Sequence, residues 1–377
     1  ECDPTQEHFI YHSWHCSSYE RRLCDKGLCY YIPMVFHNNA AYYEYFLHVN
    51  VVMVSVSPMD RHGYFNFSVN TGVAAPIVRA ADIVIVEVNE HLPTVHGGYD
   101  ECIHISEVDY VVEGEHEMFA DNVAPEPTET DRRIAKHLIP YIVDGSTLQL
   151  GIGSMPNALG EIIAQSDLKD LGMHTELCSD AYLKMYEAGK LTNHKKRLDR
   201  GKGVFGCAVG SRRLYDWLDE NPGVAAYPLE YVNRPSIIAQ IDNMVSINSC
   251  VAMDLYGQVA AESSGSRQIS GTGGQLDFLI GASASHGGKA FICMSSVYRD
   301  RDGETHSRIV PQFNGDIITS PRSQVYFLAT EYGVINLEGR STWERAEALI
   351  SIAHPAFRDR LIREAQERRI WRRSNKR

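Results

Sequence analysis

Residues 147–163, TLQLGIGSMPNALGEII, combine a glycine turn with the start of a helix, a pairing that often binds negatively charged groups. The pattern predicts a strand, the turn, and a helix that opens at Pro156, whose missing N–H would be unpaired at a helix start. We expect free backbone N–H groups at Gly151 and Gly153, which can bind an anion or a developing oxyanion. The dinucleotide pattern GxGxxG does not fit, because Pro156 stands at its third glycine.

Residues 171–189, LGMHTELCSDAYLKMYEAG, place Glu176 at the end of a short apolar strand. Ser179 and Asp180 follow it and can cap the next helix. A carboxylate in this place can act as a nucleophile, although most such carboxylates are solvated. Spacing alone does not select the nucleophile, because three more glutamates end apolar runs: Glu87, Glu262 and Glu331.

Residues 267–290 contain the run GTGGQLDFLIG, with glycines at 271, 273 and 274. Neither a helix interior nor a strand interior favours such a run. Close approach of the backbone to a ligand explains it, and we expect Gly273 and Gly274 to make that contact. The alternative is a flexible loop without a ligand.

The opening stretch EHFIYHSWHC contains four possible metal ligands: His8, His12, His15 and Cys16. On a helix these histidines would share one face, which is a zinc-like spacing. The stretch lacks the glutamate of HExxH and is interleaved with aromatic residues. The alternative is a mixed aromatic and histidine segment that packs beside a cleft.

The elements expected around these stretches belong to the α/β class. The first third of the chain predicts strands at 29–36, 49–60 and 82–90, and helices at 39–48 and 73–80. Runs such as VVMVSV and IVIVEV are apolar throughout, which favours strands buried on both faces of a mostly parallel sheet.

The chain is expected to form two related open α/β domains with an active-site cleft between them. A polar segment with prolines at 113–131 reads as a linker, which predicts domains at residues 1–125 and 126–377. The sequence MDxxG follows an apolar strand at 59–63 and again at 253–257. This order of strand, turn and later strand indicates a duplicated unit.

Charge and composition exclude several classes of protein. A net charge of −12 argues against nucleic acid as the main partner. The basic stretch at 358–377 reads as a solvated helix end. Nine cysteines without a CxxC pair predict reduced thiols and a cytoplasmic location. No apolar run reaches the roughly 18 residues of a membrane span, so no membrane partner is expected.

The motifs GIGSMPNALG, HTEL, GTGGQLDF and TEYGV, in this order, resemble the acetyl-CoA hydrolase/transferase family. Within that family they are most similar to the 4-hydroxybutyrate and butyryl-CoA:acetate CoA-transferases. The resemblance spans nearly the whole chain. Compared with the family pattern, we expect the first part of the N-terminal domain to be missing.

The resemblance implies that Glu176 is the nucleophile and forms a glutamyl-CoA thioester in a ping-pong reaction. Coenzyme A would be a substrate, with no metal and no tightly bound cofactor, and the chain would form a homodimer or a larger homo-oligomer. The implied coenzyme A contacts are Gly151, Ile152, Gly153, Ser154, Met155, Val251, Gly273 and Gly274. The opening histidines would then border the acyl cleft.

Several functions stay open on the sequence. The expected substrates are acetate, butyrate or 4-hydroxybutyrate with their acyl-CoA esters. A small dicarboxylate such as succinate or itaconate is an alternative that needs an Arg or Lys on the acyl side. An acyl-CoA hydrolase using the same glutamate and a non-catalytic coenzyme A-binding protein are further alternatives. We expect the acyl pocket to involve Tyr11, Trp14, His15, the turn in the 60s to 70s and the loop at 271–278.

Overall fold

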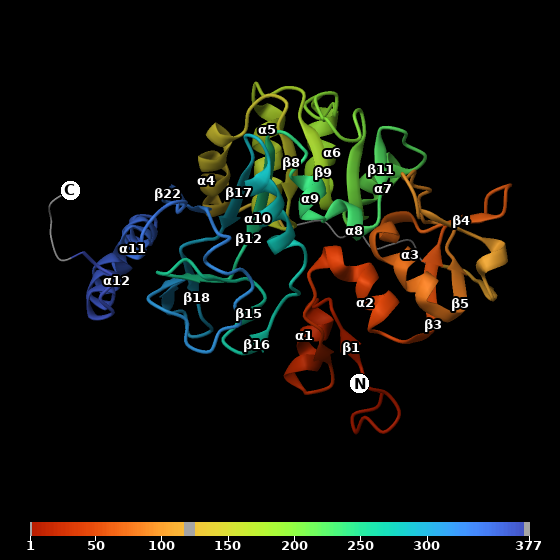
Figure 1. Cartoon of the computed structure of the whole chain (residues 1–377), viewed down its shortest axis with the longest axis horizontal. Coiled ribbons are helices and arrows are strands. Elements are labelled where there is room, and N and C mark those ends of the chain that lie inside the picture. The colour runs from red at the N-terminus through yellow and green to blue at the C-terminus, as the bar shows by residue number, and fades with distance from the viewer. Residues whose placement is uncertain (1, 117–124, 373–377) are drawn as a thin grey trace.

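A computed structural model describes residues 2–116 and 125–372 of the 377-residue chain (Figure 1). The first part forms a small sheet with its helices, which Figure 1 shows at the opposite end of the molecule from α11 and α12. Its elements are β1 (His12–Ser13), α1 (Ser18–Asp25), β2 (Tyr30–Tyr31), η1 (Phe36–Asn38), α2 (Asn39–Tyr45), β3 (Val49–Val56), β4 (Tyr64–Asn66), η2 (Ser68–Asn70), α3 (Thr71–Ala80), β5 (Ala81–Val88), β6 (Cys102–His104), η3 (Ile105–Glu107) and β7 (Tyr110–Glu113).

The second part forms a large sheet covered by helices on both faces. Its elements up to β12 are α4 (Glu129–Leu138), η4 (Ile139–Tyr141), β8 (Thr147–Leu150), α5 (Ser154–Gln165), β9 (Gly172–Cys178), α6 (Asp180–Glu187), β10 (Gly203–Ala208), α7 (Arg212–Leu218), β11 (Val224–Ala226), α8 (Leu229–Val232), α9 (Pro235–Ile238) and β12 (Met244–Ser249). The remaining elements are β13 (Ala252–Asp254), β14 (Val259–Ala260), β15 (Ser263–Ser264), β16 (Arg267–Gln268), α10 (Gln275–Ala284), β17 (Lys289–Cys293), β18 (Val297–Arg299), β19 (Thr305–Ser307), β20 (Ile309–Val310), β21 (Phe327–Thr330), β22 (Gly333–Asn336), α11 (Thr342–Ser351) and α12 (Pro355–Glu367).

The large sheet has eight strands in the order β11-β10-β9-β8-β12-β17-β21-β22. All neighbouring pairs are parallel except β21 and β22. The chain builds outward from β8 to β11 and then returns to β12 on the other side of β8. In open sheets of this kind, ligands bind at the carboxyl ends of the strands where the order reverses. The topology therefore points to the ends of β8 and β12.

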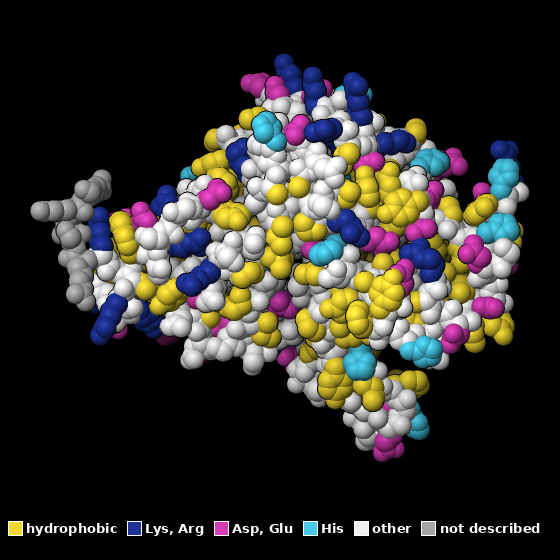
Figure 2. Space-filling model, in the orientation of Figure 1, with side chains coloured by type: hydrophobic (Ala, Val, Ile, Leu, Met, Phe, Trp, Pro, Cys, Tyr) yellow, Lys and Arg dark blue, Asp and Glu magenta, His cyan; other side chains and the backbone are white. Residues whose placement is uncertain are grey.

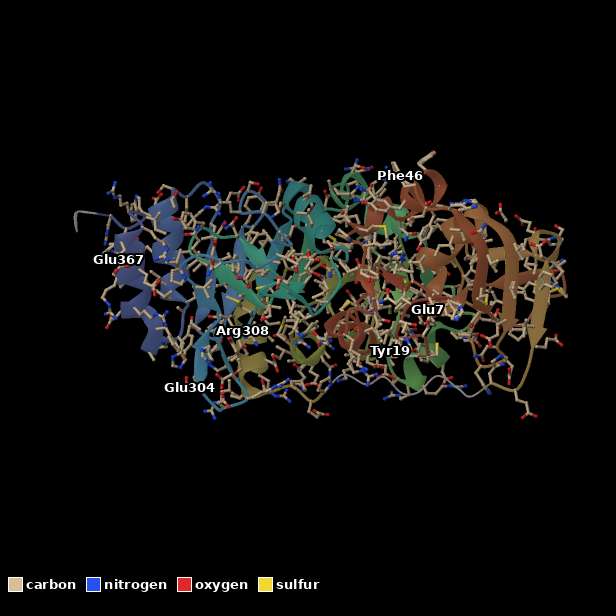
Figure 3. All side chains as sticks on the ribbon, turned by 90° about the horizontal axis from the view of Figure 1, so that it is seen from below. Glu7, Tyr19, Phe46, Glu304, Arg308 and Glu367 are labelled. Carbon is tan, nitrogen blue, oxygen red and sulfur yellow. The ribbon has the colours of Figure 1, made fainter. Side chains whose placement is uncertain are left out.

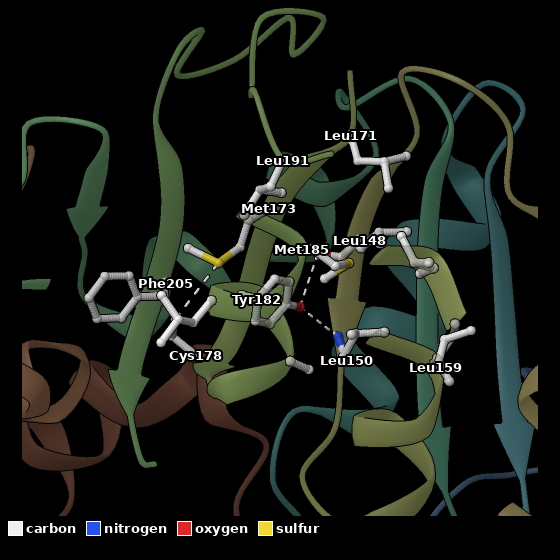
Figure 4. Close-up of a cluster of buried hydrophobic side chains, with 14 of the residues drawn as sticks. Leu148, Leu150, Leu159, Leu171, Met173, Cys178, Tyr182, Met185, Leu191 and Phe205 are labelled. Carbon is white, nitrogen blue, oxygen red and sulfur yellow. Dashed lines mark hydrogen bonds between the residues drawn. The ribbon is translucent and has the colours of Figure 1, made fainter. Parts of the chain in front are cut away.

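A gap between strands opens at the same place. β8 and β9 pair only at Thr147 with Gly172 and at Leu148 with Met173, and then diverge. The backbone N–H of Leu150 consequently donates to the hydroxyl of Tyr182, 2.8 Å away, inside the buried cluster drawn in Figure 4. The divergence leaves room beyond Leu150, and the Tyr182 hydroxyl pairs the Leu150 N–H that the sheet no longer binds.

The first part contains the three-stranded parallel sheet β3-β5-β7. Both parts share an order of elements: a strand, a DxxG turn, a helix and a parallel neighbouring strand, namely β3, α3 and β5, or β12, α10 and β17. The turn alone does not mark a repeat, because a DxxG turn at Asp300 also closes the β18–β19 hairpin. The two related α/β units with mostly parallel sheets are confirmed, while the boundary near residue 125 stays a prediction.

Two local predictions were wrong. The strand expected at 29–36 shrinks to Tyr30–Tyr31, since Pro33 has no N–H to donate and a 3-10 helix begins at Phe36. The helix expected from Pro156 begins two residues earlier, at Ser154. Pro156 is tolerated there because the first turn of a helix leaves its N–H groups unpaired.

The surface mixes both signs of charge. On the face shown in Figure 2, Lys and Arg side chains lie between Asp and Glu side chains and form no continuous basic surface. α12 confirms the helix expected near the C-terminal end, and the last five residues lie outside the described range. Among the described helices, none is long and apolar enough to cross a membrane.

Candidate active site

Glu176 lies near the end of β9, beside the gap that opens between β9 and β8. Its Oε2 accepts a hydrogen bond from Nδ2 of Asn233 at 2.6 Å, and the backbone N–H of Gly274 donates to the same carboxylate. The neighbouring strand β10 pairs with β9 on both sides of Glu176, at His174 and Thr175 and at Leu177 and Cys178. Glu176 is therefore fixed by a rigid strand on one side and two hydrogen-bond donors on the other.

The glycine run before α10 lies directly against this carboxylate. A Cβ built on Gly274 would lie 2.1 Å from Oε2 of Glu176 and 2.0 Å from Nδ2 of Asn233. A Cβ on Gly273 would lie 3.6 Å from Oε1, an ordinary contact, although Gly273 has a φ of +57°. The contact of Gly273 and Gly274 with a ligand stays a prediction, while their packing against Glu176 gives these glycines a structural reason that is strictest at Gly274.

A second strand contact holds Asn233 in place. His174, two residues before Glu176 on β9, lies 2.8 Å through Nε2 from the carbonyl oxygen of Val232. Burial lowers the pKa of His174 to about 3, so the imidazole is neutral and donates this hydrogen bond. The segment that carries Asn233 is thereby tied to the strand that carries Glu176.

The environment shifts the protonation of Glu176. Burial raises its pKa to about 7, and the negative charge of Asp277 contributes in the same direction. The hydrogen bonds from Asn233 and Gly274 oppose the shift because they stabilise the ionised form. A carboxylate with a raised pKa, partly exposed to a cavity, is a better nucleophile than one in bulk water.

Glu176 opens onto a cavity of about 430 Å³ between the two domains. The first domain contributes Trp14, His15, Phe36, Asn70 and Val73, and the second contributes Gln149 to Ile152, Asn248 and Ser249, and the loop from Ser270 to Gln275. The predicted pocket is largely present. Tyr11 is not among the lining residues, because its hydroxyl donates to Glu20 instead.

A second cavity, of about 380 Å³, meets the first at Ile152 and Ser249. The predicted coenzyme A contacts Gly153, Ser154, Met155 and Val251 all line it. Arg308 lines it as well, and its Nη1 donates to the carbonyl oxygen of Val251 at 2.8 Å. Figure 3 shows Arg308 in the second domain, toward the middle of the molecule.

One expected donor is not free. The N–H of Gly151 binds the carbonyl oxygen of Ile247 at 3.0 Å, as part of the sheet, so it cannot bind an oxyanion. Within the described part of the chain, no protein acceptor binds the N–H groups of Ile152 or Gly153. Gly153, the N-cap residue just before α5, has a φ of +121°, which only glycine adopts readily. The N–H groups of this turn that can bind a ligand are therefore those of Ile152 and Gly153, and not that of Gly151.

The three competing glutamates have other partners. Glu331 is buried and accepts from the N–H of Ser296 at 2.9 Å, so it caps a loop. Glu262 accepts from Oγ1 of Thr272 at 3.2 Å and supports the glycine loop. Glu87 lies on the first sheet, accepts from Ser55, and lines neither cavity.

The opening histidines do not form a helical face. The first helix begins only at Ser18, after an extended segment, so the zinc-like spacing of His8, His12 and His15 has no helix to support it. His15 lines the cavity beside Glu176, whereas His12 packs against the ring of Tyr30. This placement matches the alternative of an aromatic and histidine segment beside a cleft.

Sequence reasoning missed several residues of the site. Asn233 is 57 residues from Glu176 and has no motif around it. Phe36 and His37 come from a segment that was expected to be part of a strand or its end. Gln149 had a signal, because it is a polar residue inside the buried strand β8, and it lines the cavity.

Comparisons with known proteins agree on one family. Residues 1–121 match the acetyl-CoA hydrolase/transferase N-terminal domain, and residues 210–365 match the C-terminal domain. The chain is 48% identical to the butyryl-CoA:acetate CoA-transferase of Anaerostipes caccae, over 99% of this chain and 84% of that protein. It is 40% identical to the 4-hydroxybutyrate coenzyme A transferase of Clostridium kluyveri, over 96% and 83%. The crystal structure of RipA from Yersinia pestis matches with a TM-score of 0.88 and 36% identity, over 96% and 82%.

Proposed function

Because the chain belongs to the acetyl-CoA hydrolase/transferase family, we propose that it moves coenzyme A between a short-chain acyl-CoA and a carboxylate, with Glu176 as the nucleophile. The observation that carries the proposal is the position of Glu176 in the wall of the 430 Å³ cavity, which meets the second cavity at Ile152 and Ser249. Nδ2 of Asn233 lies 2.6 Å from its carboxylate, and the Gly273–Gly274 backbone lies against the same group.

The reaction proceeds in two half-reactions through a covalent enzyme. The ionised carboxylate of Glu176 attacks the acyl-CoA carbonyl, which releases the coenzyme A thiolate and leaves a mixed anhydride. The thiolate then attacks the glutamyl carbonyl, so that a glutamyl-CoA thioester forms and the first carboxylate leaves. The acceptor carboxylate then attacks the glutamyl thioester, which releases the coenzyme A thiolate and forms a second mixed anhydride. The thiolate attacks the acceptor's carbonyl in this anhydride, so that a new acyl-CoA forms and the Glu176 carboxylate is regenerated. Ping-pong kinetics follow.

The donors around Glu176 suit each step. When the glutamyl carbonyl is attacked, negative charge develops on its oxygen, and Nδ2 of Asn233 already lies 2.6 Å from a carboxylate oxygen. The N–H of Gly274 is a second donor to the same group. A preorganised donor of this kind contributes about 3 kcal/mol to the stabilisation of an oxyanion.

Each cavity has its own role in this scheme. The coenzyme A arm lies in the cavity lined by Gly153, Ser154, Met155 and Val251, with Arg308 as the positive charge nearest to it. The thioester carbonyl reaches Glu176 past Gly151 and Ile152, and the acyl group occupies the 430 Å³ cavity.

The acyl cavity favours an uncharged acyl group. Its floor carries the amides of Gln149 and Asn248, which hydrogen-bond to each other at 3.1 Å, and none of its described lining residues is Lys or Arg. Acetyl, butyryl and 4-hydroxybutyryl groups are therefore preferred over succinyl or itaconyl groups, which need a cation for the second carboxylate.

The remaining parts of the proposal rest on the family and the composition. We assign the reaction to the cytoplasm, with coenzyme A as a substrate and no tightly bound cofactor or metal. We expect a homodimer or a larger homo-oligomer, without nucleic acid or membrane partners. The division into domains at residues 1–125 and 126–377 belongs to the same proposal.

Release and transfer of coenzyme A separate the candidate functions. The protein is incubated with butyryl-CoA, with and without acetate, and acetyl-CoA and free coenzyme A are measured. A transferase forms acetyl-CoA only when acetate is present and releases little free coenzyme A. Release of coenzyme A at full rate without acetate identifies a hydrolase. A protein that binds coenzyme A, turns over no acyl-CoA and is unaffected by Glu176→Ala is non-catalytic.

A further inference from the structure

A histidine of the first domain holds an aspartate of the second domain beside the nucleophile. Nδ1 of His37 lies 2.6 Å from Oδ1 of Asp277, and the backbone N–H of His37 donates to Oδ2 at 3.1 Å. Both oxygens of the carboxylate are engaged by one residue that is 240 positions away in sequence. The Asp277 side chain is 2% exposed, and that of His37 is 27% exposed.

Asp277 lies in the first turn of α10, three residues after Gly274. Residues three apart lie on one face of a helix, so Asp277, which His37 binds, and the Gly274 N–H, which donates to Glu176, belong to the same turn. The segment that carries His37 also packs beside α8, just ahead of Asn233, the second donor to the nucleophile. One contact between domains thus supports both donors.

We propose that His37 and Asp277 form a positioning pair, which locks the first turn of α10 and keeps the Gly274 N–H and Glu176 in their reactive arrangement. Neither residue touches the reacting atoms in this account. The inference rests on the proposed function, because a position is reactive only if Glu176 is the nucleophile.

The pair also sets the charge around the nucleophile. Asp277 is the charged neighbour whose field raises the pKa of Glu176, while Cys207 faces Glu176 as a neutral thiol, since burial raises its pKa to about 12. His37 is the donor that faces Asp277. A buried carboxylate without such a donor would be costly, so the loss of His37 should disturb this turn rather than leave it unchanged.

A set of four variants tests the pair: His37→Ala, His37→Asn, Asp277→Asn and the double variant His37→Ala with Asp277→Asn. Asn places an amide N–H close to the position of Nδ1, so His37→Asn should keep most of the activity. His37→Ala should lower kcat about tenfold or more, since small displacements of a reacting group are expensive. The double variant should lose no more activity than His37→Ala alone.

The pH profile separates positioning from a general loss of structure. Removing the Asp277 charge lowers the pKa of Glu176, so Asp277→Asn should move the acid limb of kcat/KM to lower pH. A variant that merely unfolds in part would lose amplitude without this shift.

A matched control comes from another histidine–aspartate pair. Nε2 of His306 lies 2.6 Å from Oδ2 of Asp300 in the β18–β19 hairpin, and Glu304 of that hairpin lies at the edge of the molecule in Figure 3. His306→Ala should leave kcat, KM and the pH profile unchanged. A loss equal to that of His37→Ala would overturn the proposal.

The outcomes distinguish this inference from the proposed function. An active wild-type protein whose kcat changes less than twofold in His37→Ala, or whose His37 and Asp277 effects simply add, refutes the positioning pair alone. A wild-type protein that moves no coenzyme A refutes the proposed function, and the positioning role falls with it. A tenfold loss in His37→Ala, recovery in His37→Asn and the acid shift in Asp277→Asn together support the pair.

Discussion

The two parallel sheets of the molecule differ in how they are covered. In the large sheet, every residue of β8 is buried, and β10 and β12 are buried along most of their length. In the small sheet, one face is open: Met53 is 78% exposed and Tyr110 is 61% exposed on neighbouring parts of it. Parallel sheets are usually covered on both faces, so the large sheet is the conventional one.

The two domains also differ in which residues they supply to the proposed site. The nucleophile and its two donors come from the covered sheet and the helices packed on it, where packing fixes side chains within fractions of an ångström. The first domain reaches the site through the loop that carries Trp14 and His15, through Phe36 and Asn70 of two 3-10 helices, and through Val73 near the start of α3. We therefore assign bond-making to the second domain and substrate selection and positioning to the first.

The largest effect is expected at the nucleophile. Glu176→Gln keeps the shape of the side chain but removes the attacking carboxylate, so kcat/KM for butyryl-CoA should fall by about 10⁴-fold or more. The variant should keep its thermal stability and its affinity for coenzyme A. An activity within tenfold of wild type would show that another residue is the nucleophile. The assignment of bond-making to the covered sheet would then be wrong.

Gly273 and Gly274 together test whether the second domain fixes the position of the Glu176 carboxylate. Gly274→Ala would place a methyl group 2.1 Å from Oε2 of Glu176, so the carboxylate must move, and kcat should fall by about 100-fold. Gly273→Ala meets an ordinary contact at 3.6 Å and costs only about 1 kcal/mol of backbone strain. Steady-state kinetics and thermal melts of both variants check this. Equal losses of kcat at the two positions would contradict the geometry.

The pH dependence should report the same carboxylate. The pKa of Glu176 is raised to about 7, and only the ionised form attacks, so activity should rise with pH through this range. A single group of this kind predicts a roughly tenfold lower kcat/KM at pH 6 than at pH 8. A flat profile between pH 5 and pH 8 would mean that the carboxylate is not perturbed in this way.

The smallest effect is expected in the first domain. Trp14 lines the acyl cavity, packs edge-on against Phe36 with ring centroids 5.3 Å apart, and donates through Nε1 to the hydroxyl of Tyr43. Trp14→Ala should change the preference between acetyl-CoA and butyryl-CoA by about five- to tenfold, with kcat for the better substrate within about threefold of wild type. Competition between the two acyl-CoA substrates measures this. A loss of kcat as large as that of Gly274→Ala would show that the first domain contributes to bond-making as much as the second.

The sequence is informative wherever the signal is local. The apolar runs around Val52 and Val86 form parallel strands as expected, but the prediction that both faces are buried was wrong, since Met53 is 78% exposed on the open face. The glycine run at 271–274 packs against Glu176, while its contact with a ligand stays a prediction. The order of the motifs along the chain also indicates the family. These features depend on neighbours in sequence, which a pattern records directly.

Other parts could not be predicted because they depend on distant contacts. Nothing near Asn233 or His37 indicates that they would meet Glu176 and Asp277 across 57 and 240 positions. Register decides the fate of the Gly151 N–H, which pairs with β12 rather than remaining free. The choice of Glu176 over Glu262 and Glu331 likewise depends on the family resemblance, since all three end apolar runs.

The most direct test is the mass of the enzyme after incubation with butyryl-CoA and no acceptor, followed by digestion and peptide mapping. The account predicts a coenzyme A adduct on the peptide that contains Glu176, which disappears when acetate is added and is absent in Glu176→Gln. An adduct on a peptide containing Glu262 or Glu331 instead, with the Glu176 peptide unmodified, would contradict it.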